Sequence, residues 1–367
     1  MNNKEKRILS TILEIINDAK EGKMFILVDN ENRENEGDLV IPASMCDYTK
    51  VNFMAKYGRG LICLALSEKR VKELELPLMS QNNESRNKTA FTVSIEAREG
   101  ISTGISAFDR AKTISDAINP KKDKNSIVSP GHIFPLKAEN GGVLVRAGHT
   151  EAAVDIAKLA GLNPSGVICE IMNDDGTMAR MPQLIKFAQK HQMKIATIAD
   201  LIEYRRKNEK LVEVVKKEKF LSKIAGEFEA IVYRNKLDDI EHIALVKGKI
   251  DQNSATLVRM HHLNILTDCL DDQNNSRTNL LSKALKKISK EKNGVLVLIR
   301  QPNEKISHLL GDQNQTPNKE KELRNYGIGA QILADLGIKN MILLANTKKS
   351  VIGLEAYDIK ICGYKKL

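Results

Sequence analysis

The sequence predicts an α+β protein built from two domains. Short runs with strand-like alternation are interspersed with longer segments whose apolar residues recur at helical spacing. The 367 residues, 42% hydrophobic and 28% charged, have the composition of an ordinary globular protein and a length that suits about two domains. A densely charged stretch, RRKNEKLVEVVKKEK, begins at Arg205 and indicates a boundary. We therefore predict a first domain over residues 1–205, a charged linker over 206–219 and a second domain over 220–367.

Composition excludes several classes of protein. No apolar run approaches the length of about 20 residues that crosses a bilayer, and the opening MNNKEKRILS lacks the apolar core of a signal peptide. The five cysteines are scattered without a CxxC pair, which favours a reduced, cytoplasmic protein with neither disulfides nor a cysteine zinc site. The net charge of +10 suits anionic ligands, but aromatic residues make up only 4% and basic residues are dispersed. We expect no membrane and no nucleic-acid partner.

The first domain is expected to begin with an amphipathic helix, Ile8 to Ala19, which Gly22 closes. The remaining elements are predicted in order as a strand over 24–28, a glycine-rich turn into a strand over 57–66, a polar loop over 80–89, a strand over 91–95, a strand ending at Arg146, a helix from about 150 to 160, a strand over 166–172 and a helix over 197–206.

The densest cluster of charges lies in DNENRENEGDLVIP, residues 29–42, between two apolar runs. Arg33, Glu34, Glu36 and Asp38 place four ionised side chains within six positions, where like charges raise one another's pKa values unless a cation lies among them. A solvated acidic turn is one interpretation. The position directly after a strand favours a functional loop instead, and carboxylates without cysteine suit a hard ion such as Mg²⁺.

A second group of candidates lies between residues 100 and 150. GISTGIS, residues 100–106, is either a phosphate-binding turn or a plain one. His132 lies between turn residues and an apolar run, where a lone histidine is either structural or catalytic. Arg146, the first turn of the helix that follows it and the Thr150 hydroxyl would form an anion site, and His149 in the same turn is a candidate metal ligand.

Glu170 is predicted to lie inside a strand, GVICEIM. By alternation it shares a face with Ile168 and Met172, where an ionisable group is costly unless it is paired or its pKa is raised. That pattern fits a general acid or base, or else a glutamate that faces water at a sheet edge.

Four segments together carry a specific resemblance: RENEGD, PGHIFPL, RAGHTEA and CEIMNDDGTMAR, beginning at residues 33, 130, 146 and 169. In this order and spacing they resemble 3,4-dihydroxy-2-butanone-4-phosphate synthase of riboflavin biosynthesis, over about residues 5–205. The resemblance implies a domain with one mixed sheet flanked by helices. It also implies a homodimer with active sites near the interface, and a lyase that converts D-ribulose 5-phosphate to L-3,4-dihydroxy-2-butanone 4-phosphate and formate.

The same resemblance assigns roles position by position. It implies that Glu34 and His149 ligate Mg²⁺ or Mn²⁺ and that His132 and Glu170 are the essential catalytic residues. Contacts with the phosphosugar substrate are implied for Arg33, Glu34, Asp38, Arg146, Ala147, Gly148, His149, Thr150 and Glu170.

The second domain is predicted as a sequence of strands and two helices. The strands are expected over 228–233, 242–247, 255–260, 294–299 and 341–344, and the helices over 280–289 and 322–336. EHIALVKG, LVRMHH, LRNYGIGAQILADLGI and VIGLEAY, which begin at residues 241, 257, 323 and 351, resemble GTP cyclohydrolase II, an α/β fold.

This second resemblance departs from the family pattern where the chemistry is expected. The three zinc cysteines of the family are replaced by Asn264, Asn275 and Arg277, with Cys269 as a single thiol nearby. RQPNEKISHLL, from Arg300, replaces the basic segment that binds phosphate and base, and ANTKKS ends in Ser350 where the family has lysine. Glu322 still precedes Arg324 at the places of the catalytic acid and arginine.

Two interpretations of the second domain stay open. We expect a degenerate domain without zinc and without GTP cyclohydrolase II activity, kept for structure or regulation. The alternative is a bifunctional enzyme that also hydrolyses GTP to a diaminopyrimidine with release of formate, its zinc held by unusual ligands such as His261 and His262.

Overall fold

The structure is a computed structural model that describes residues 9–31, 33–80, 82–272, 278–301, 306, 319–346 and 357–367; over 319–326 it describes the backbone alone. The chain divides into two compact units between Arg205 and Arg206. Within the described ranges, no helix combines the length and the apolarity needed to cross a membrane.

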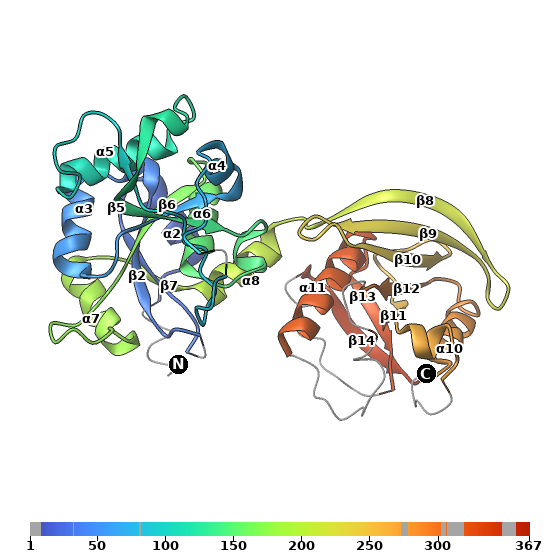
Figure 1. The fold of residues 1–367 in the computed structure, drawn as a ribbon. Helices are drawn as coiled ribbons and strands as arrows, with labels where there is room; N and C mark the ends of the chain where they lie inside the picture. The colour runs from blue at the N-terminus through green and yellow to red at the C-terminus, as the bar shows by residue number, and fades with distance from the viewer. Residues whose placement is uncertain are drawn as a thin grey trace. The chain divides into compact units, whose positions relative to one another are not determined.

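The first unit is a seven-stranded mixed sheet with helices on both faces (Figure 1). Its strands, in the order β4-β5-β3-β6-β2-β1-β7 across the sheet, pair parallel at β3–β5 and β1–β7 and antiparallel elsewhere. Along the chain they are β1 (Phe25–Val28), β2 (Gly37–Pro42), β3 (Cys63–Ser67), β4 (Ile95–Ala97), β5 (Ile127–Ala138), β6 (Ser165–Glu170) and β7 (Ile195–Thr197). The expected mixed sheet is confirmed.

Two separate apolar layers hold the helices on this sheet. One face packs against α3 (Tyr48–Phe53), α4 (Glu68–Glu73), α5 (Ala107–Ile118) and α7 (Met181–His191). The other packs against α2 (Ile12–Lys20), α6 (His149–Leu159) and α8 (Ile198–Asn208). Because both faces are buried, the central strands are almost continuously apolar, as FILV in β1 and GVIC in β6 illustrate. Short 3₁₀ turns at Ala43–Met45, Lys124–Ser126 and Gly142–Leu144 and a π-helical turn at Met54–Gly58 complete the unit.

Two predicted strands of the first unit differ from the structure. The strand expected over 91–95 overlaps β4 only at Ile95. The strand expected to end at Arg146 is replaced by the 3₁₀ turn Gly142–Leu144. Asp155 of α6 explains the difference, because its carboxylate accepts the Val143 N–H at 2.8 Å and is paired with Arg205 at 2.7 Å. Gly141 and Gly142 both have positive φ, and a Cβ at Gly142 would collide with Asp155. The backbone therefore bends onto a buried carboxylate and does not pair with a strand.

The second unit contains another seven-stranded mixed sheet, ordered β14-β13-β11-β12-β10-β9-β8. Its elements are β8 (Val212–Ser222), β9 (Gly226–Asn235), β10 (Glu241–Lys247), β11 (Thr256–His262), α9 (Ile265–Asp268), α10 (Leu280–Ile288), β12 (Gly294–Ile299), α11 (Lys319–Asp335), β13 (Asn340–Leu344) and β14 (Lys360–Lys365). The strands and helices predicted for this half are present, with ends shifted by a few residues.

The charged segment predicted as a linker is mostly a strand. From Val212 onward it forms β8, which pairs with β9 in a long hairpin at the edge of the sheet (Figure 1). β8 is the outermost strand of the sheet, and most of its side chains are exposed. Such a strand needs no apolar alternation, and charged residues on an edge discourage pairing with other chains, so its composition resembles that of a linker.

Two substitutions in α2 would measure how much its buried face contributes to the stability of the first unit. Ile15 is fully buried in the sheet-facing layer, whereas Leu13, two residues earlier, is 56% exposed. Ile15→Ala should lower the free energy of unfolding by about 2–5 kcal/mol because it leaves a cavity. The matched control Leu13→Ala should change it by less than about 0.5 kcal/mol. Urea titration followed by circular dichroism measures both; equal effects would contradict the assignment of the buried face.

Candidate active site

The alternation of three adjacent strands brings three acidic side chains to one face of the sheet. Leu27, Val40 and Ile168 belong to the apolar layer under α6. Asp29, Asp38 and Glu170 stand two residues along from these positions, at the ends of β1, β2 and β6, and so face the same side. Asp38 lies directly opposite Glu170 in the β2–β6 register, an arrangement of like charges that is unfavourable by itself.

Asp29 organises the loop that joins β1 to β2. Its buried carboxylate accepts hydrogen bonds from the Glu34 N–H at 3.1 Å, the Glu36 N–H at 2.9 Å and Arg33 Nη1 at 2.8 Å. From the opposite side, Arg180 Nη1 donates to the Glu34 carbonyl at 2.8 Å and also to the Asn35 carbonyl. The acidic loop is therefore held in one conformation and is not a freely solvated turn.

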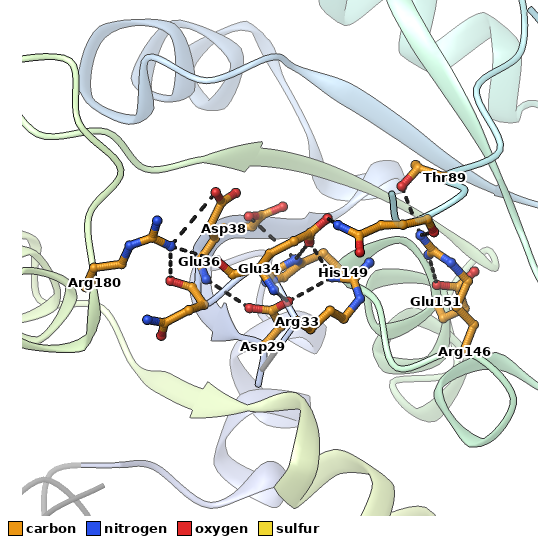
Figure 2. Close-up of polar contacts among 12 residues, drawn as sticks. Asp29, Arg33, Glu34, Glu36, Asp38, Thr89, Arg146, His149, Glu151 and Arg180 are labelled. Carbon is orange, nitrogen blue, oxygen red and sulfur yellow. Dashed lines mark hydrogen bonds and ion pairs between the residues drawn. The ribbon is translucent and has the colours of Figure 1, made fainter. Parts of the chain in front are cut away.

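This loop carries Glu34 to the N-terminus of α6, where His149 is the first helical residue (Figure 2). His149 Nδ1 lies 3.8 Å from Glu34 Oε2 and 3.7 Å from Asp38 Oδ1. Asp29, Glu34 and His149 each offer a ligand atom, and these atoms lie within 4.8 Å of one another. Arg33 forms ion pairs with Asp29 and Glu34 at the same place.

The donor set fits a hard divalent cation. Carboxylate oxygens dominate, a single imidazole joins them, and no thiol belongs to the group. Asp38 Oδ1 and His149 Nε2 are buried without a hydrogen-bond partner among the described residues. Unpaired buried polar atoms are costly, and a bound cation with its water molecules would satisfy such groups.

Burial and mutual repulsion shift the protonation of the acids. Burial raises the pKa of Asp38 well above its usual range, and the charge of Glu170 raises it further. Burial also raises the pKa of Glu170, although the hydrogen bond from the Leu61 N–H at 2.8 Å opposes the shift. Desolvation lowers the pKa of His149, against the attraction of Asp29 and Glu34, and keeps the imidazole neutral as a metal ligand requires. A carboxyl pair with raised pKa values suits proton transfer near neutral pH.

The position of Glu170 depends on a glycine. Gly60 of the turn before β3 lies so close that a Cβ there would collide with the carboxylate and the backbone of Glu170. The adjacent Leu61 N–H then reaches the Glu170 carboxylate. The predicted alternation of β6 is thus confirmed, and the glutamate faces the acidic cluster and not open solvent.

The turn before α6 brings together the groups from which the sequence predicts an anion site, Arg146 and the first turn of the helix. Gly148 is the N-cap, and a Cβ there would lie within 2.5 Å of Arg146 Nη1 and 2.9 Å of Glu151 Oε2. Arg146 donates to Glu151 Oε2 at 2.6 Å and to Thr89 Oγ1 at 2.9 Å. The first N–H groups of the helix face the same turn, so an anion would meet both backbone donors and a fixed guanidinium.

His132 lies apart from this cluster. It stands on β5, which is separated from β2 by β3 and β6. Its side chain is 43% exposed, and its Nδ1 contacts Glu96 of β4. No contact between His132 and Glu34, Asp38, His149 or Glu170 is found within the part of the chain that the structure describes.

The GISTGIS turn forms its own hydrogen bonds. Asp109 of α5 accepts the Ser102 N–H at 3.2 Å, the Ser102 hydroxyl at 2.9 Å and the Gly104 N–H at 3.0 Å. These donors are therefore engaged within the unit, which favours the plain turn over the phosphate-binding one.

In the second unit, His261 and His262 lie next to each other on β11 and face opposite sides of the sheet. His261 is buried, and its Nε2 contacts Asp268 Oδ2 at 2.9 Å. Asn264 caps α9 by accepting the Leu266 N–H at 2.9 Å. The described residues contain no second group of three metal-binding side chains beyond Asp29, Glu34 and His149. The structure does not describe the side chains of several positions that the sequence singled out: Asn275, Arg277, Ser350, Glu322, Arg324 and most of RQPNEKISHLL.

Several contributors were not singled out from the sequence. Asp29 joins the candidate metal group, and the alternation of β1 places it on the face of Leu27, a signal that was available. Asn87 and Thr89 belong to a polar loop without periodicity, so nothing local indicates that they contact Glu34 and Arg146. Glu151 pairs with Arg146, but this contact can be predicted only when the residue at which α6 begins is known.

Comparisons with known proteins support both resemblances. The family model for 3,4-dihydroxy-2-butanone 4-phosphate synthase matches residues 13–204, and the model for GTP cyclohydrolase II matches residues 213–366. A 3,4-dihydroxy-2-butanone 4-phosphate synthase of Photobacterium phosphoreum is 49% identical over 362 residues, which cover 97% of this chain and 99% of the relative.

Two solved structures extend the comparison. RibBX, a two domain 3,4-dihydroxy-2-butanone 4-phosphate synthase from A. baumannii, is 41% identical with a TM-score of 0.75, over 97% of this chain and 99% of that one. A 3,4-dihydroxy-2-butanone 4-phosphate synthase in complex with two magnesium ions is 36% identical with a TM-score of 0.53, over 55% of this chain and 98% of that one. The predicted architecture, a synthase domain followed by a domain like GTP cyclohydrolase II, is confirmed.

The raised pKa of Asp38 predicts a stability that depends on pH. In the unfolded chain this carboxyl ionises near pH 3.9, whereas in the folded chain it holds its proton to higher pH. Stability therefore falls as the pH rises from about 4 through the folded-state pKa. With EDTA present, Asp38→Asn should unfold at higher urea concentration than the wild type at pH 7, and the difference should shrink towards pH 4. An equal difference at both pH values would contradict the buried, repelled carboxylate.

Proposed function

The chain belongs to the 3,4-dihydroxy-2-butanone 4-phosphate synthase family of riboflavin biosynthesis, and we propose that its first unit converts D-ribulose 5-phosphate to L-3,4-dihydroxy-2-butanone 4-phosphate and formate. The observation that supports this most directly is that candidate metal ligands, a carboxyl pair and the start of a helix lie close together. The ligand atoms of Asp29, Glu34 and His149 lie together at the N-terminus of α6, and Asp38 of the neighbouring carboxyl pair lies 3.7 Å from His149 Nδ1. The reaction needs each of them.

We propose Mg²⁺ or Mn²⁺ as the cation, held by Glu34 and His149, with Asp29 at the same place. The relative whose structure contains two magnesium ions supports the choice of metal. A bound divalent ion would act as a Lewis acid that stabilises negative charge on the sugar oxygens. Asp29 fixes the loop that presents Glu34, and the neutral His149 keeps a nitrogen lone pair available.

The protons are assigned to this chain's own side chains. Loss of C4 as formate requires enediolisation, loss of a hydroxyl, a carbon shift and a final cleavage, and each proton movement needs a positioned acid or base. Glu170, with its carboxylate held by the Leu61 N–H, is proposed as one such group, and His132 as the other. Asp38, buried opposite Glu170, is proposed to bind the sugar hydroxyls with Arg33.

The phosphate is proposed to bind at Arg146, Ala147, Gly148, His149 and Thr150. It takes no part in bond breaking. Holding it fixes the sugar relative to Glu34 and Glu170, so that binding energy from a remote group orients the reacting carbons. Glycine is needed at position 148, because a Cβ there would collide with Arg146 Nη1 and Glu151 Oε2.

For the second unit we propose a structural or regulatory role without zinc and without GTP hydrolysis. Attack on the guanine ring needs a metal-activated water, and Asn is a poor zinc ligand while Arg cannot ligate at all. Because His261 and His262 face opposite sides of β11, they cannot hold one ion together. The match of the GTP cyclohydrolase II model to residues 213–366 is the observation that keeps a bifunctional enzyme as the alternative.

The first test is turnover by the full chain. With Mg²⁺ it should release formate from D-ribulose 5-phosphate, and EDTA should abolish the reaction. Glu170→Gln removes the acid–base group with little change in shape, so it should bind substrate but lose turnover by a factor of about 10² or more. Near-wild-type turnover by Glu170→Gln, measured by formate release, would remove Glu170 from the mechanism.

A second test addresses the proposed homodimer, in which His132 of one copy would serve the cluster of the other. Chains carrying His132→Ala and Glu34→Ala should each be inactive as homodimers. A heterodimer of the two, isolated through different affinity tags, would contain one intact site and should regain activity. An inactive heterodimer with a normal melting temperature, or a stable, fully active monomer in light scattering, would contradict the shared site.

The third test concerns the second unit. Supplied with GTP, Mg²⁺ and Zn²⁺, the protein should release neither formate nor the diaminopyrimidine, and the purified protein should contain no zinc by elemental analysis. Clear GTP turnover that Arg324→Ala abolishes would establish the bifunctional alternative.

A further inference from the structure

The polar segment between α4 and β4 lies against Glu34 of the acidic cluster. Residues 78–91 form most of the wall of a cavity of about 370 Å³, and Glu34 forms the rest. That volume lies within the range of small-molecule sites. Because Glu34 and the segment line the same cavity, a molecule bound there would contact both. Two residues of this segment, Asn87 and Thr89, carry side-chain bonds to the site.

Asn87 holds one of the two oxygens of the Glu34 carboxylate. Its amide Nδ2 donates to Glu34 Oε1 at 2.6 Å. The other oxygen, Oε2, faces His149 Nδ1 at 3.8 Å and contacts Arg33. The amide therefore selects which oxygen of Glu34 is presented to the cation-binding group.

The same short segment also holds the arginine of the anion turn. Arg146 Nη2 donates to Thr89 Oγ1 at 2.9 Å, and Nη1 donates to Glu151 Oε2 at 2.6 Å (Figure 2). Nη2 also donates to the Asn87 carbonyl at 3.2 Å. Thr89 in turn is tied to its own loop, because its carbonyl accepts from Asn83 Nδ2 at 2.9 Å. The guanidinium is thus fixed from the helix on one side and from the loop on the other.

We propose that Asn87 and Thr89 are positioning residues with separate tasks. Asn87 orients Glu34 for the divalent cation, and Thr89 orients Arg146 for the phosphate of the substrate. The inference rests on the proposed function for the identity of the substrate, but its metal half does not need turnover to be tested. Partners that orient a ligand typically affect metal affinity or activity by 10–100-fold, although they do not touch the ion.

The experiment uses the full chain and measures two quantities. Binding of Mn²⁺ without substrate is followed by the electron paramagnetic resonance of the free ion, and kcat and KM for D-ribulose 5-phosphate are measured at saturating Mg²⁺. Asn87→Ala should raise the Mn²⁺ dissociation constant by about tenfold or more. Thr89→Val should leave Mn²⁺ binding unchanged and raise KM by about tenfold, with a smaller effect on kcat, because one hydrogen bond to a charged group is lost.

Asn82→Ala is the matched control, since the Asn82 amide donates to Glu84 in the same exposed loop at 3.0 Å. It should leave both quantities unchanged, and melting temperatures of all three variants separate local effects from unfolding. Wild-type Mn²⁺ affinity in Asn87→Ala, or parallel losses in both quantities for all three variants, would overturn the inference. Absence of formate release from the wild type would instead defeat the proposed function, while the Mn²⁺ titration would still test Asn87.

Discussion

The structure of the first unit is constrained by like charges at the end of three neighbouring strands. Asp29, Asp38 and Glu170 share one face of the sheet, and the β1–β2 loop adds Glu34 to them. Each acid raises the cost of ionising the others, which is why burial and the neighbouring charges together raise the pKa of Asp38. A sequence optimised for stability alone would not place them together. A bound cation, or a proton retained on one of the acids, would offset the repulsion.

The surrounding contacts keep this arrangement in place from several directions. Arg180 holds the backbone of the acidic loop, Asn87 holds the Glu34 side chain, and the Leu61 N–H holds Glu170. These contacts come from the N-cap of α7, the 78–91 segment and the turn before β3, so elements distant in sequence converge on the acidic loop and on Glu170. When side chains are already fixed in the free protein, ordering them on substrate binding costs less free energy. Such a preorganised site suits a reaction with several successive steps.

The sequence predicted those parts of the site that lie on elements with a regular repeat, the alternation of a strand or the spacing of a helix. Alternation placed Glu170 on the same face as Ile168, and the helix signal after Arg146 placed His149 in a first turn. The failures have physical causes. Where a strand was expected, the Val143 N–H donates to the Asp155 carboxylate of α6. These residues are a dozen positions apart, so no local sequence pattern indicates the interaction. The apolar run of β8 is interrupted by charged residues, because most side chains of this edge strand are exposed. The separation of His132 from the cluster follows from strand order, which the sequence does not specify.

The reaction proposed for the acidic cluster removes one internal carbon of a sugar phosphate. It is tested most directly by incubating the full chain and Mg²⁺ with D-ribulose 5-phosphate labelled with ¹³C at C4 and recording the products by NMR. We expect the label to appear in formate and the four-carbon phosphate to be unlabelled. Label retained in the four-carbon product, or formate without label, would contradict it.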